Sequence, residues 1–376
     1  MGGILLSSLL APESTLLGAL SPASQDLGLQ DASQTLGWLA SLPPASRDLG
    51  LGTFSPSTNT LSSLAAMNGL LNYTPPVNYI PSRWIAVQQR FEEFHRNLAL
   101  TPSQHSDGHT KRHGVVSCLN RAYYGTNSEI DNSFFVGSWA KNTAIRPPRD
   151  VDVYFVLPPA VYNRFQGYAW ARQSALLQEV KNNLAATFPN TEMRGDGQVV
   201  MVNFGSYNVE VVPAFLLTTG HYWICNTANG GTYKETAPWA EVNHLSSVDT
   251  ANGGNLLPLI RMLKAWQATC SVPLKSFQIE LIAADFIQQS PWRFRNFFWF
   301  DWIVRDFLVY LYSRANSFVF VPGTSEAIWL GDDWKSRTQT AYSRAVKACE
   351  YEDLNMVELA GEEWQKIFGI NIPRTV

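Results

Sequence analysis

The sequence predicts an α/β fold, more narrowly α+β, in which a small mixed sheet is followed by a helical lobe. Between residues 133 and 213, short runs alternate apolar with polar residues, and a period of two is typical of strands that are buried on one face. From about residue 254, apolar residues instead recur at steps of three and four, which is the period of helices packed on one side. We therefore expect a sheet domain that precedes a helical one.

Residues 1–75 differ in composition from the rest of the chain. They are rich in Leu, Ser, Ala, Gly and Pro, and the segment LSPASQDLGLQ (20–30) recurs as LPPASRDLGLG (42–52) with eight of eleven positions identical. The few charged residues before residue 80 are Glu13, Asp26, Asp31, Arg47 and Asp48. This composition predicts a mobile N-terminal extension of low complexity. Translation from Met67 and a docking segment for a partner are the alternatives.

The predicted core, residues 76–215, opens with a helix. Its apolar stripe recurs every three or four residues and consists of Trp84, Val87, Phe91, Phe94 and Leu98, with Ser82 as the candidate cap. The next segment, QHSDGHTKRH, holds His105, His109 and His113 at a spacing of four, which on a helix would place them on one face. Its Asp-Gly pair favours a solvated loop that leads into a helix over 109–122, and a metal site is the weaker alternative.

Two carboxylates stand at the start of the strand predicted over residues 151–157. Because strand side chains alternate, Asp150 and Asp152 share one face, and the apolar residues between and after them share the other. Fixed carboxylate pairs suit oxygen-loving divalent cations such as Mg²⁺, which bind together with substrate phosphates. Shortly upstream, after a strand over 133–136, the Gly137–Ser138 turn offers backbone N–H groups and a hydroxyl to those phosphates.

A third acid fits the same arrangement. After a helix predicted over residues 162–187, strands are predicted over 198–204 and 207–213, joined by a Gly-Ser turn. Pro213 is expected to end the sheet. In the second of these strands Glu210 points away from the apolar face. If this strand lies beside the strand of the two aspartates, Glu210 joins them, and three carboxylates can hold two metal ions roughly 3.5–4 Å apart.

These features follow one another in a recognisable order. Residues 137–152 read G-S-x-x-K-x-T-x-I-x-x-x-x-D-x-D, and about sixty residues later an acid stands in E-V-V-P-A-F. The pattern resembles the nucleotidyltransferase core of the DNA polymerase β type. More narrowly, it resembles the bacterial cyclic oligonucleotide synthases (CD-NTases) of anti-phage signalling, which are relatives of cyclic GMP-AMP synthase and oligoadenylate synthetase. Over about residues 80–350, the resemblance implies a polymerase β-type core with a mixed sheet and an oligoadenylate-synthetase-like helical C-terminal lobe.

The second lobe is predicted over residues 216–376. An irregular aromatic stretch is expected first, over 217–250. The helices expected after it span about 254–269, 275–289, 296–313, 334–350 and 355–368. A ligand pocket is expected in the cleft between this lobe and the sheet.

The resemblance also implies roles for individual residues. Asp150, Asp152 and Glu210 would be catalytic and would hold two Mg²⁺ or Mn²⁺ ions, although the family more often has Asp at the third position. The nucleotide-binding residues that it implies are Gly137, Ser138, Lys141, Lys264, Ser276 and Phe277. Thr143 also matches the motif, and we expect it to be structural.

Four of these residues would contact the donor nucleotide. Ser138 and Lys264, the latter in R-x-x-K-x-W, would hold its triphosphate. Ser276 would meet the triphosphate as well, and Phe277 would stack on the donor base. Taken alone, however, a helix cation is usually solvated and a helix phenylalanine usually belongs to the core. Weaker candidates for nucleotide contacts are Arg261, Tyr222, Trp223 and Trp239.

The activity implied by the resemblance is nucleotidyl transfer from nucleoside triphosphates, with release of pyrophosphate, to give a cyclic di- or trinucleotide for a downstream effector. The alternatives are a linear oligoadenylate-type or tRNA-end nucleotidyltransferase, a glycosyltransferase with a lone D-x-D, and a non-catalytic nucleotide-binding partner or antitoxin. The balance of 28 Lys+Arg against 31 Asp+Glu gives a net charge of −3, whereas proteins that grip long nucleic acids are usually basic. We therefore expect no stable nucleic-acid partner.

The remaining features of the sequence indicate a cytoplasmic protein. The cysteines are isolated from one another, with no C-x-x-C pair, and are Cys118, Cys225, Cys270 and Cys349. They predict reduced thiols and no zinc ribbon. No apolar run approaches the roughly 18–20 residues of a membrane span, and the N-terminus lacks the basic region of a secretory signal.

Overall fold

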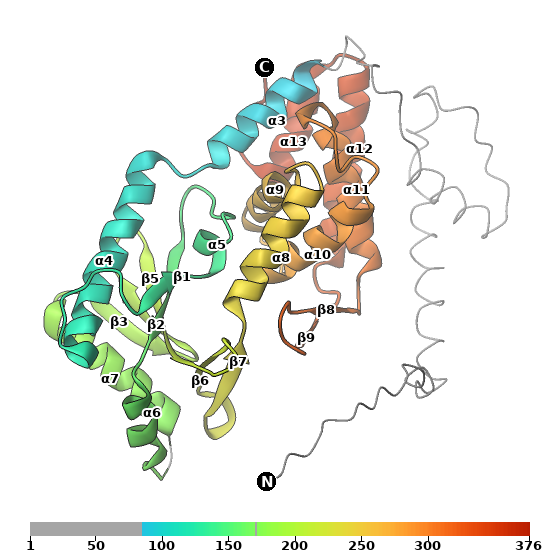
Figure 1. Cartoon of the computed structure of the whole chain (residues 1–376). Coiled ribbons are helices and arrows are strands. Elements are labelled where there is room, and N and C mark those ends of the chain that lie inside the picture. The colour runs from blue at the N-terminus through green and yellow to red at the C-terminus, as the bar shows by residue number, and fades with distance from the viewer. Residues whose placement is uncertain (1–84, 170) are drawn as a thin grey trace, which may run out of the picture.

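The computed structural model describes residues 85–169 and 171–376, in which a sheet lies beside a lobe of helices (Figure 1). The expected N-terminal extension over 1–75, with its repeat and Met67, lies outside the described residues, as do Ser82 and Trp84 of the expected first helix. Both predicted parts of the fold, the sheet and the helical lobe, fall within them.

Within the described residues, a seven-stranded mixed sheet forms the first part of the fold. Its strands are β1 (Ser133–Phe135), β2 (Asp150–Val156), β3 (Glu192–Asp196), β4 (Val199–Asn203), β5 (Asn208–Leu216), β6 (Tyr222–Asn226) and β7 (Thr232–Thr236). The order is β1–β2–β5–β4–β3, and β6 and β7 continue the sheet from the end of β5. Only β2 and β5 pair in parallel. The mixed sheet and the strands expected over 133–136, 151–157, 198–204 and 207–213 are thus confirmed.

Two expectations about the end of this sheet are wrong. The stretch over 217–250 is not irregular, because it contains β6, β7 and most of a helix. Pro213 does not end the sheet but lies inside β5, opposite Phe155 of β2. Strand β4 pairs with β5 only as far as Val211, and β6 pairs with β5 only from Ala214 on. Pro213 lies in the gap between them, so neither antiparallel neighbour needs the N–H that proline lacks.

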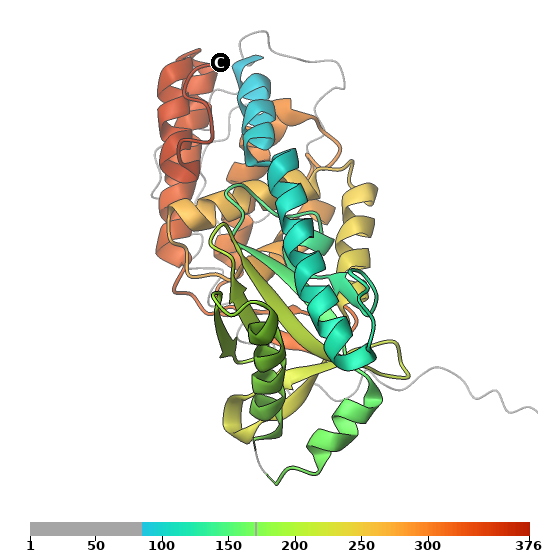
Figure 2. The same cartoon turned by 90° about the vertical axis from the view of Figure 1, so that its left-hand side faces the viewer.

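Helices cover the apolar face of the sheet, as Figure 2 shows. They are α4 (Pro102–Tyr124), α6 (Pro159–Gln166) and α7 (Arg172–Thr187). Alternate valines of β2, β4 and β5 are fully buried against α4 and α7, as the period of two predicts. The opposite face of β2 is left to carry Asp150 and Asp152, on the side of the helical lobe.

The segment before residue 109 is helical, so the loop expected there is wrong. Helix α4 begins already at Pro102, because Thr101 caps it reciprocally: the Thr101 hydroxyl accepts from the Gln104 N–H, and the Gln104 side chain accepts from the Thr101 N–H. Gly108 marks close packing in place of a turn, since a Cβ at this position would overlap the Trp139 ring.

The single helix expected over 162–187 is two helices. Gly167 caps the C-terminus of α6. Ala171, which precedes α7, has φ of 53°, in the left-handed region that a right-handed helix cannot include. The chain therefore turns between α6 and α7.

The helical lobe contains the helices that were expected from residue 254 on. Its elements are α3 (Ile85–Leu98), α8 (Pro238–Ala251), α9 (Leu256–Thr269), α10 (Ser276–Gln289), α11 (Phe300–Ser313), α12 (Lys335–Asp353), α13 (Val357–Phe368) and a small hairpin of β8 (Phe318–Phe320) and β9 (Ala327–Trp329). Trp266, Trp334 and Trp364 are fully buried at its centre. Among the described residues, this lobe holds the largest of three hydrophobic cores.

Helix α3 precedes the sheet in sequence but packs in the helical lobe (Figure 1). Its buried side chains include Val87, Phe91, Phe94 and Leu98. Arg90 of α3 forms a fully buried ion pair with Glu352 of α12, with 3.0 Å between Nε and Oε1. Strands β6 and β7 also continue the sheet past residue 216. The division of the chain into a core over 76–215 and a helical lobe over 216–376 therefore stays a proposal.

Two further properties concern the described residues in both parts of the fold. In the part of the chain that the structure describes, no helix combines the length and the apolar character that crossing a membrane requires. Cys118, Cys225, Cys270 and Cys349 are free thiols. Burial raises the pKa of the Cys225 thiol to about 12, so this cysteine is unreactive near neutral pH.

Candidate metal and nucleotide site

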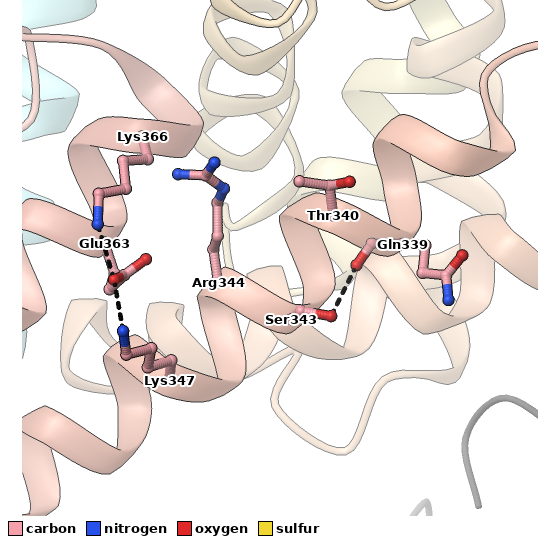
Figure 3. Close-up of a pocket in the computed structure, with 7 residues that line it drawn as sticks. All are labelled: Gln339, Thr340, Ser343, Arg344, Lys347, Glu363 and Lys366. Carbon is pink, nitrogen blue, oxygen red and sulfur yellow. Dashed lines mark hydrogen bonds and ion pairs between the residues drawn. The ribbon is translucent and has the colours of Figure 1, made fainter. Parts of the chain in front are cut away.

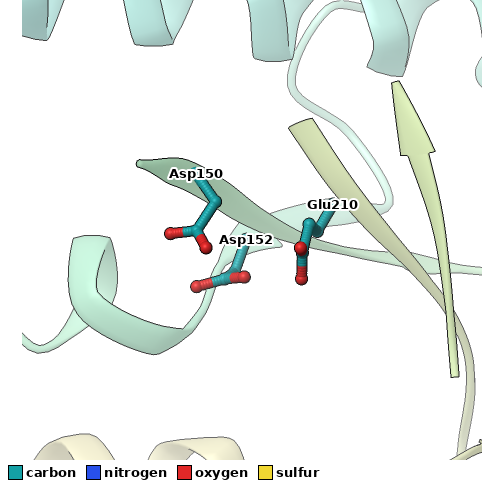
Figure 4. Close-up of side chains that lie close together, drawn as sticks. All are labelled: Asp150, Asp152 and Glu210. Atoms are coloured by element: carbon teal, nitrogen blue, oxygen red, sulfur yellow. The ribbon is translucent and has the colours of Figure 1, made fainter. Parts of the chain in front are cut away.

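Three carboxylates meet on the polar face of β2 and β5, as Figure 4 shows. The two strands are parallel neighbours, and their register sets Asp152 directly beside Glu210. Asp150 lies two residues earlier on the same face. One oxygen from each of the three side chains lies within 4.8 Å of the others. The expected adjacency of the two strands is therefore present, and it gathers the three acids that the sequence singled out.

The acids repel one another in a partly dry environment. Burial, together with the charges of Asp150 and Glu210, raises the pKa of Asp152 to about 8. Burial also raises the pKa values of Asp150 and Glu210. Among the described residues, this is the only group of three or more His, Cys, Asp or Glu side chains at metal-binding distances. A donor set made only of carboxylate oxygens fits Mg²⁺ or Mn²⁺ and does not fit a softer metal.

The turn that precedes β2 is built around Asp152. Gly137, the first residue of α5 (Gly137–Ala140), has φ of 56°, which favours glycine. A Cβ here would lie 2.9 Å from Asp152 Cγ and would overlap the carboxylate oxygen Oδ2. The Val136 N–H donates to the Asp152 carbonyl oxygen at 3.0 Å. Only glycine therefore lets the turn approach this carboxylate so closely.

An aromatic cluster supports the other aspartate. The Trp139 Nε1–H donates to the Asp150 carbonyl oxygen at 2.9 Å. The Trp139 ring contacts His105 and His109 of α4, with centroids 5.4 and 6.1 Å away. The three histidines do share one helix face, as their spacing allowed. They act there as ring contacts, and within residues 85–169 and 171–376 they do not form a metal-binding group.

A cavity of about 230 Å³ opens between the acids and the helical lobe. Eight of the nine predicted site residues line it: Gly137, Ser138, Lys141, Asp150, Asp152, Lys264, Ser276 and Phe277. Glu210 does not line it and joins the site through the carboxylate cluster. The structure thus brings together residues that lie up to about 140 positions apart in the sequence.

A buried ion cluster that sequence reasoning missed forms part of the cavity wall. Glu280 of α10 pairs with Lys264 at 2.6 Å and with Lys141 at 2.9 Å. Lys141 also pairs with Glu241 of α8 at 3.1 Å. Although burial opposes ionisation, the two lysines hold the pKa of Glu280 at about 2. The available signal was one acid at position 280 within the apolar run FQIELIAA, because a charge on a buried stripe needs a partner.

The weaker candidates lie elsewhere. Arg261 does not line the cavity and instead donates from Nη2 to the Asn142 carbonyl and side-chain oxygens, at 2.8 and 2.9 Å. Tyr222 and Trp239 both pack against the ring of Phe134. Trp223 stacks on a neighbouring tyrosine of the sheet. None of the four lines the cavity, and Trp239 is 45% exposed.

A second concavity lies between α12 and α13 (Figure 3). Its lining residues are Gln339, Thr340, Ser343, Arg344, Lys347, Glu363 and Lys366. Lys347 and Lys366 both pair with Glu363, at 3.1 and 2.8 Å, and this single carboxylate offsets part of the positive charge of the concavity. It contains none of the predicted site residues, and we do not assign the nucleotide site to it.

A comparison with known families agrees with the geometry. Residues 85–249 match the family of the Second Messenger Oligonucleotide or Dinucleotide Synthetase domain, SMODS. The match covers 165 of the 376 residues, slightly less than half of the chain. The matched span includes β1 to β7 with the three acids and the Gly137–Ser138 turn. The resemblance to the bacterial cyclic oligonucleotide synthases is thereby confirmed for the domain.

The individual relatives that this chain matches are distant. A probable cyclic nucleotide synthase of Bacillus cereus strain VD146 is 22% identical over 215 residues, which cover 53% of this chain and 62% of the relative. The chain thus spans less than two thirds of that relative's length. The structure of CdnC from E. coli MS115-1 with ATP is 18% identical, with a TM-score of 0.54, over 76% of this chain and 98% of CdnC.

Two other structures share the same fold. Vibrio cholerae DncV, a cyclic AMP-GMP synthase bound to a linear pppA(3′,5′)pG intermediate, is 12% identical with a TM-score of 0.53, over 85% of this chain and 92% of DncV. CdnG from Bradyrhizobium diazoefficiens with GTP is 12% identical with a TM-score of 0.53, over 76% of this chain and 96% of CdnG. At such identities the likeness concerns the fold, and the expected polymerase β-type nucleotidyltransferase fold is confirmed.

Proposed function

We propose that this protein is a metal-dependent nucleotidyltransferase that makes a cyclic di- or trinucleotide from nucleoside triphosphates and releases pyrophosphate. The observation that carries the proposal is the convergence of Asp150, Asp152 and Glu210 beside the Gly137–Ser138 turn, at a cavity that Lys141 and Lys264 also line. Three acids alone would suit many metal sites. Acids together with a turn that can bind phosphate and with cationic side chains suit nucleotidyl transfer.

The three carboxylates would hold Mg²⁺ or Mn²⁺. Such ions, when bound, polarise the α-phosphate and lower the pKa of an attacking hydroxyl. The chain supplies the geometry: the parallel register fixes Asp152 beside Glu210, and the Trp139 hydrogen bond fixes the backbone at Asp150. Glu210, which lies off the cavity, would help to activate the hydroxyl of the acceptor nucleotide.

The nucleotide would lie in the cavity with its phosphates toward the turn. Ser138 offers a hydroxyl there, and Lys264 and Lys141, both paired with glutamates, line the cavity on the side of the helical lobe. Ser276 and Phe277 open helix α10 on the same side, where Phe277 can stack on a base. An acceptor hydroxyl would attack the α-phosphorus in line and expel pyrophosphate, and a second transfer would close the ring.

The wider setting follows from the family resemblance. We propose that the cyclic product binds a downstream effector in bacterial anti-phage signalling, in the cytoplasm, and that free nucleotides are the substrates. The relatives CdnC and CdnG were solved with ATP and with GTP, which supports nucleotide substrates of either base. CdnC has also been solved in a complex with a HORMA protein, which makes a protein partner worth testing for this chain.

Pyrophosphate release tests the transfer step. The full chain is incubated with each nucleoside triphosphate, and with pairs of them, in Mg²⁺ or Mn²⁺, and pyrophosphate is detected by a coupled enzyme. The wild type should release pyrophosphate, whereas Asp150→Ala/Asp152→Ala should not. Release of orthophosphate in its place would indicate hydrolysis, and no pyrophosphate under any of these conditions would refute the proposal.

A further inference from the structure

We propose that Glu280 is a positioning residue, the centre of a buried clamp that ties the phosphate-binding turn of the sheet to three helices of the other lobe. The clamp consists of Glu280, Lys264, Lys141, Thr143 and Glu241. Its effect on turnover rests on the function proposed above, whereas its effect on stability does not. In this view Glu280 holds the Lys264 ammonium group in place and keeps it charged, and Lys264 acts on the triphosphate from that fixed position.

One carboxylate makes the central contacts of the clamp. Glu280 Oε1 accepts from Lys264 Nζ at 2.6 Å and from Thr143 Oγ1 at 2.7 Å. Glu280 Oε2 lies 2.9 Å from Lys141 Nζ. The Glu280 side chain is 3% exposed, so these contacts are hardly screened by water.

The ammonium group of Lys264 is fully used inside the protein. It has three N–H donors, and three acceptors surround it: Glu280 Oε1, Thr143 Oγ1 at 2.8 Å and the Thr143 carbonyl oxygen at 3.2 Å. A direct bond from Lys264 to a phosphate would therefore replace a bond that already exists. This saturation favours a positioning role over a direct one.

Lys141 is held in a similar way. Its Nζ pairs with Glu280 and, at 3.1 Å, with Glu241, and it lies 4.3 Å from the centre of the Phe277 ring. The two lysines and the two glutamates together carry no net charge. A neutral, buried and hydrogen-bonded cluster rigidifies the structure around it, but losing one member leaves a buried charge without its partner.

The clamp reaches the catalytic turn through the backbone. The Thr143 N–H donates to the Ser138 carbonyl oxygen at 2.9 Å, and the Lys141 N–H donates to the Gly137 carbonyl oxygen at 3.1 Å. The partners on the other side belong to α8, α9 and α10 through Glu241, Lys264 and Glu280. A shift of Glu280 is therefore passed to the turn that touches Asp152.

A double-mutant cycle tests the clamp. Glu280→Gln and Lys264→Met should each lower the Tm of the full chain by roughly 5–10 °C, because each leaves an uncompensated buried charge. The double variant Glu280→Gln/Lys264→Met removes both charges and should recover at least half of the loss of either single variant. Tm losses that simply add would overturn the clamp.

Nucleotide affinity distinguishes positioning from direct contact. Binding of a fluorescent ATP analogue in Mn²⁺ should weaken in Lys264→Met and recover at least threefold in the double variant. If Lys264 contacts the triphosphate itself, the double variant will bind as weakly as Lys264→Met, which would overturn the proposal. If the wild type binds no nucleotide at all, the proposed function fails, while the Tm cycle still upholds or overturns the clamp.

A matched control and a milder variant complete the design. Lys234 of β7 pairs with Glu326 at 2.8 Å, but both side chains are about one third exposed, so Lys234→Met should change Tm by less than about 2 °C.

Should Glu280→Gln not fold, Thr143→Val removes the bridging hydroxyl without burying a charge. It should lower kcat roughly tenfold with little change in KM, and an unchanged kcat would overturn the proposal.

Discussion

Gly137→Ala tests how closely the phosphate-binding turn is fitted to Asp152. An alanine Cβ at this position would lie 2.9 Å from Asp152 Cγ and would overlap Oδ2. Since ordinary contacts between such atoms are about 3.5 Å or more, the carboxylate or the turn must move by about 1 Å. The backbone strain of a non-glycine residue at φ of 56° adds about 1–2 kcal/mol.

Stability and activity should respond very differently to this change. The strain predicts a fall in Tm of roughly 3–6 °C. A displacement of about 1 Å at a reacting centre can reduce the rate about a hundredfold. Turnover is measured as pyrophosphate release, with Tm measured on the same samples.

Gly125→Ala is the matched control for this variant. Gly125 has φ of 68°, yet a Cβ added there meets nothing within 4 Å, and it ends α4 away from the acids. It should lose a similar amount of stability and keep its turnover. Equal turnover losses in the two variants would show that backbone strain, and not the contact with Asp152, is responsible, and the reasoning would be refuted.

Three further predictions concern charge. Asp152→Asn should abolish product formation while Tm stays equal or rises, since a repelled carboxylate is removed; a clear fall in Tm would contradict this. Burial raises the pKa of Asp301 to about 8, and Arg305 opposes this in part. The folded state therefore binds more protons than the unfolded one between about pH 4 and pH 8. Across this window the free energy of unfolding falls as pH rises, by up to about 1.4 kcal/mol per pH unit. The Tm of Asp301→Asn minus the Tm of the wild type should therefore increase from pH 5.5 to pH 8. Parallel profiles of Tm against pH would argue against this prediction. Arg90→Met leaves Glu352 buried and unpaired and should cost about 3–5 kcal/mol of unfolding free energy in denaturant titrations, whereas a loss below about 1 kcal/mol would mean that the pair is not structural.

The centre of the fold and the acids were predictable because they depend on local alternation. The run from Asp150 to Val156 alternates so regularly that the faces of its side chains follow from the sequence. The same holds for the run around Glu210, and a parallel pairing of the two strands brings the acids together. The Gly-Ser turn could be placed for a similar reason, since it lies directly between two such strands.

The errors arose where a distant contact decides the local structure. Gly108 looks like a turn residue until Trp139 is found packed against it. Pro213 looks like a strand end until the gap between its two antiparallel neighbours is known. The partners of Glu280 lie 16 and 139 positions away, at Lys264 and Lys141, so the acid within its apolar run indicates that a partner is needed but not which residues supply it.

The most direct test of the central claim is the identity of the product. The full chain is incubated with labelled nucleoside triphosphates and Mg²⁺ or Mn²⁺, treated with phosphatase and examined by mass spectrometry, beside Asp150→Ala/Asp152→Ala. The account predicts a phosphatase-resistant cyclic di- or trinucleotide that only the wild type makes. A phosphatase-sensitive linear ladder, or the same product from the double variant, would contradict it.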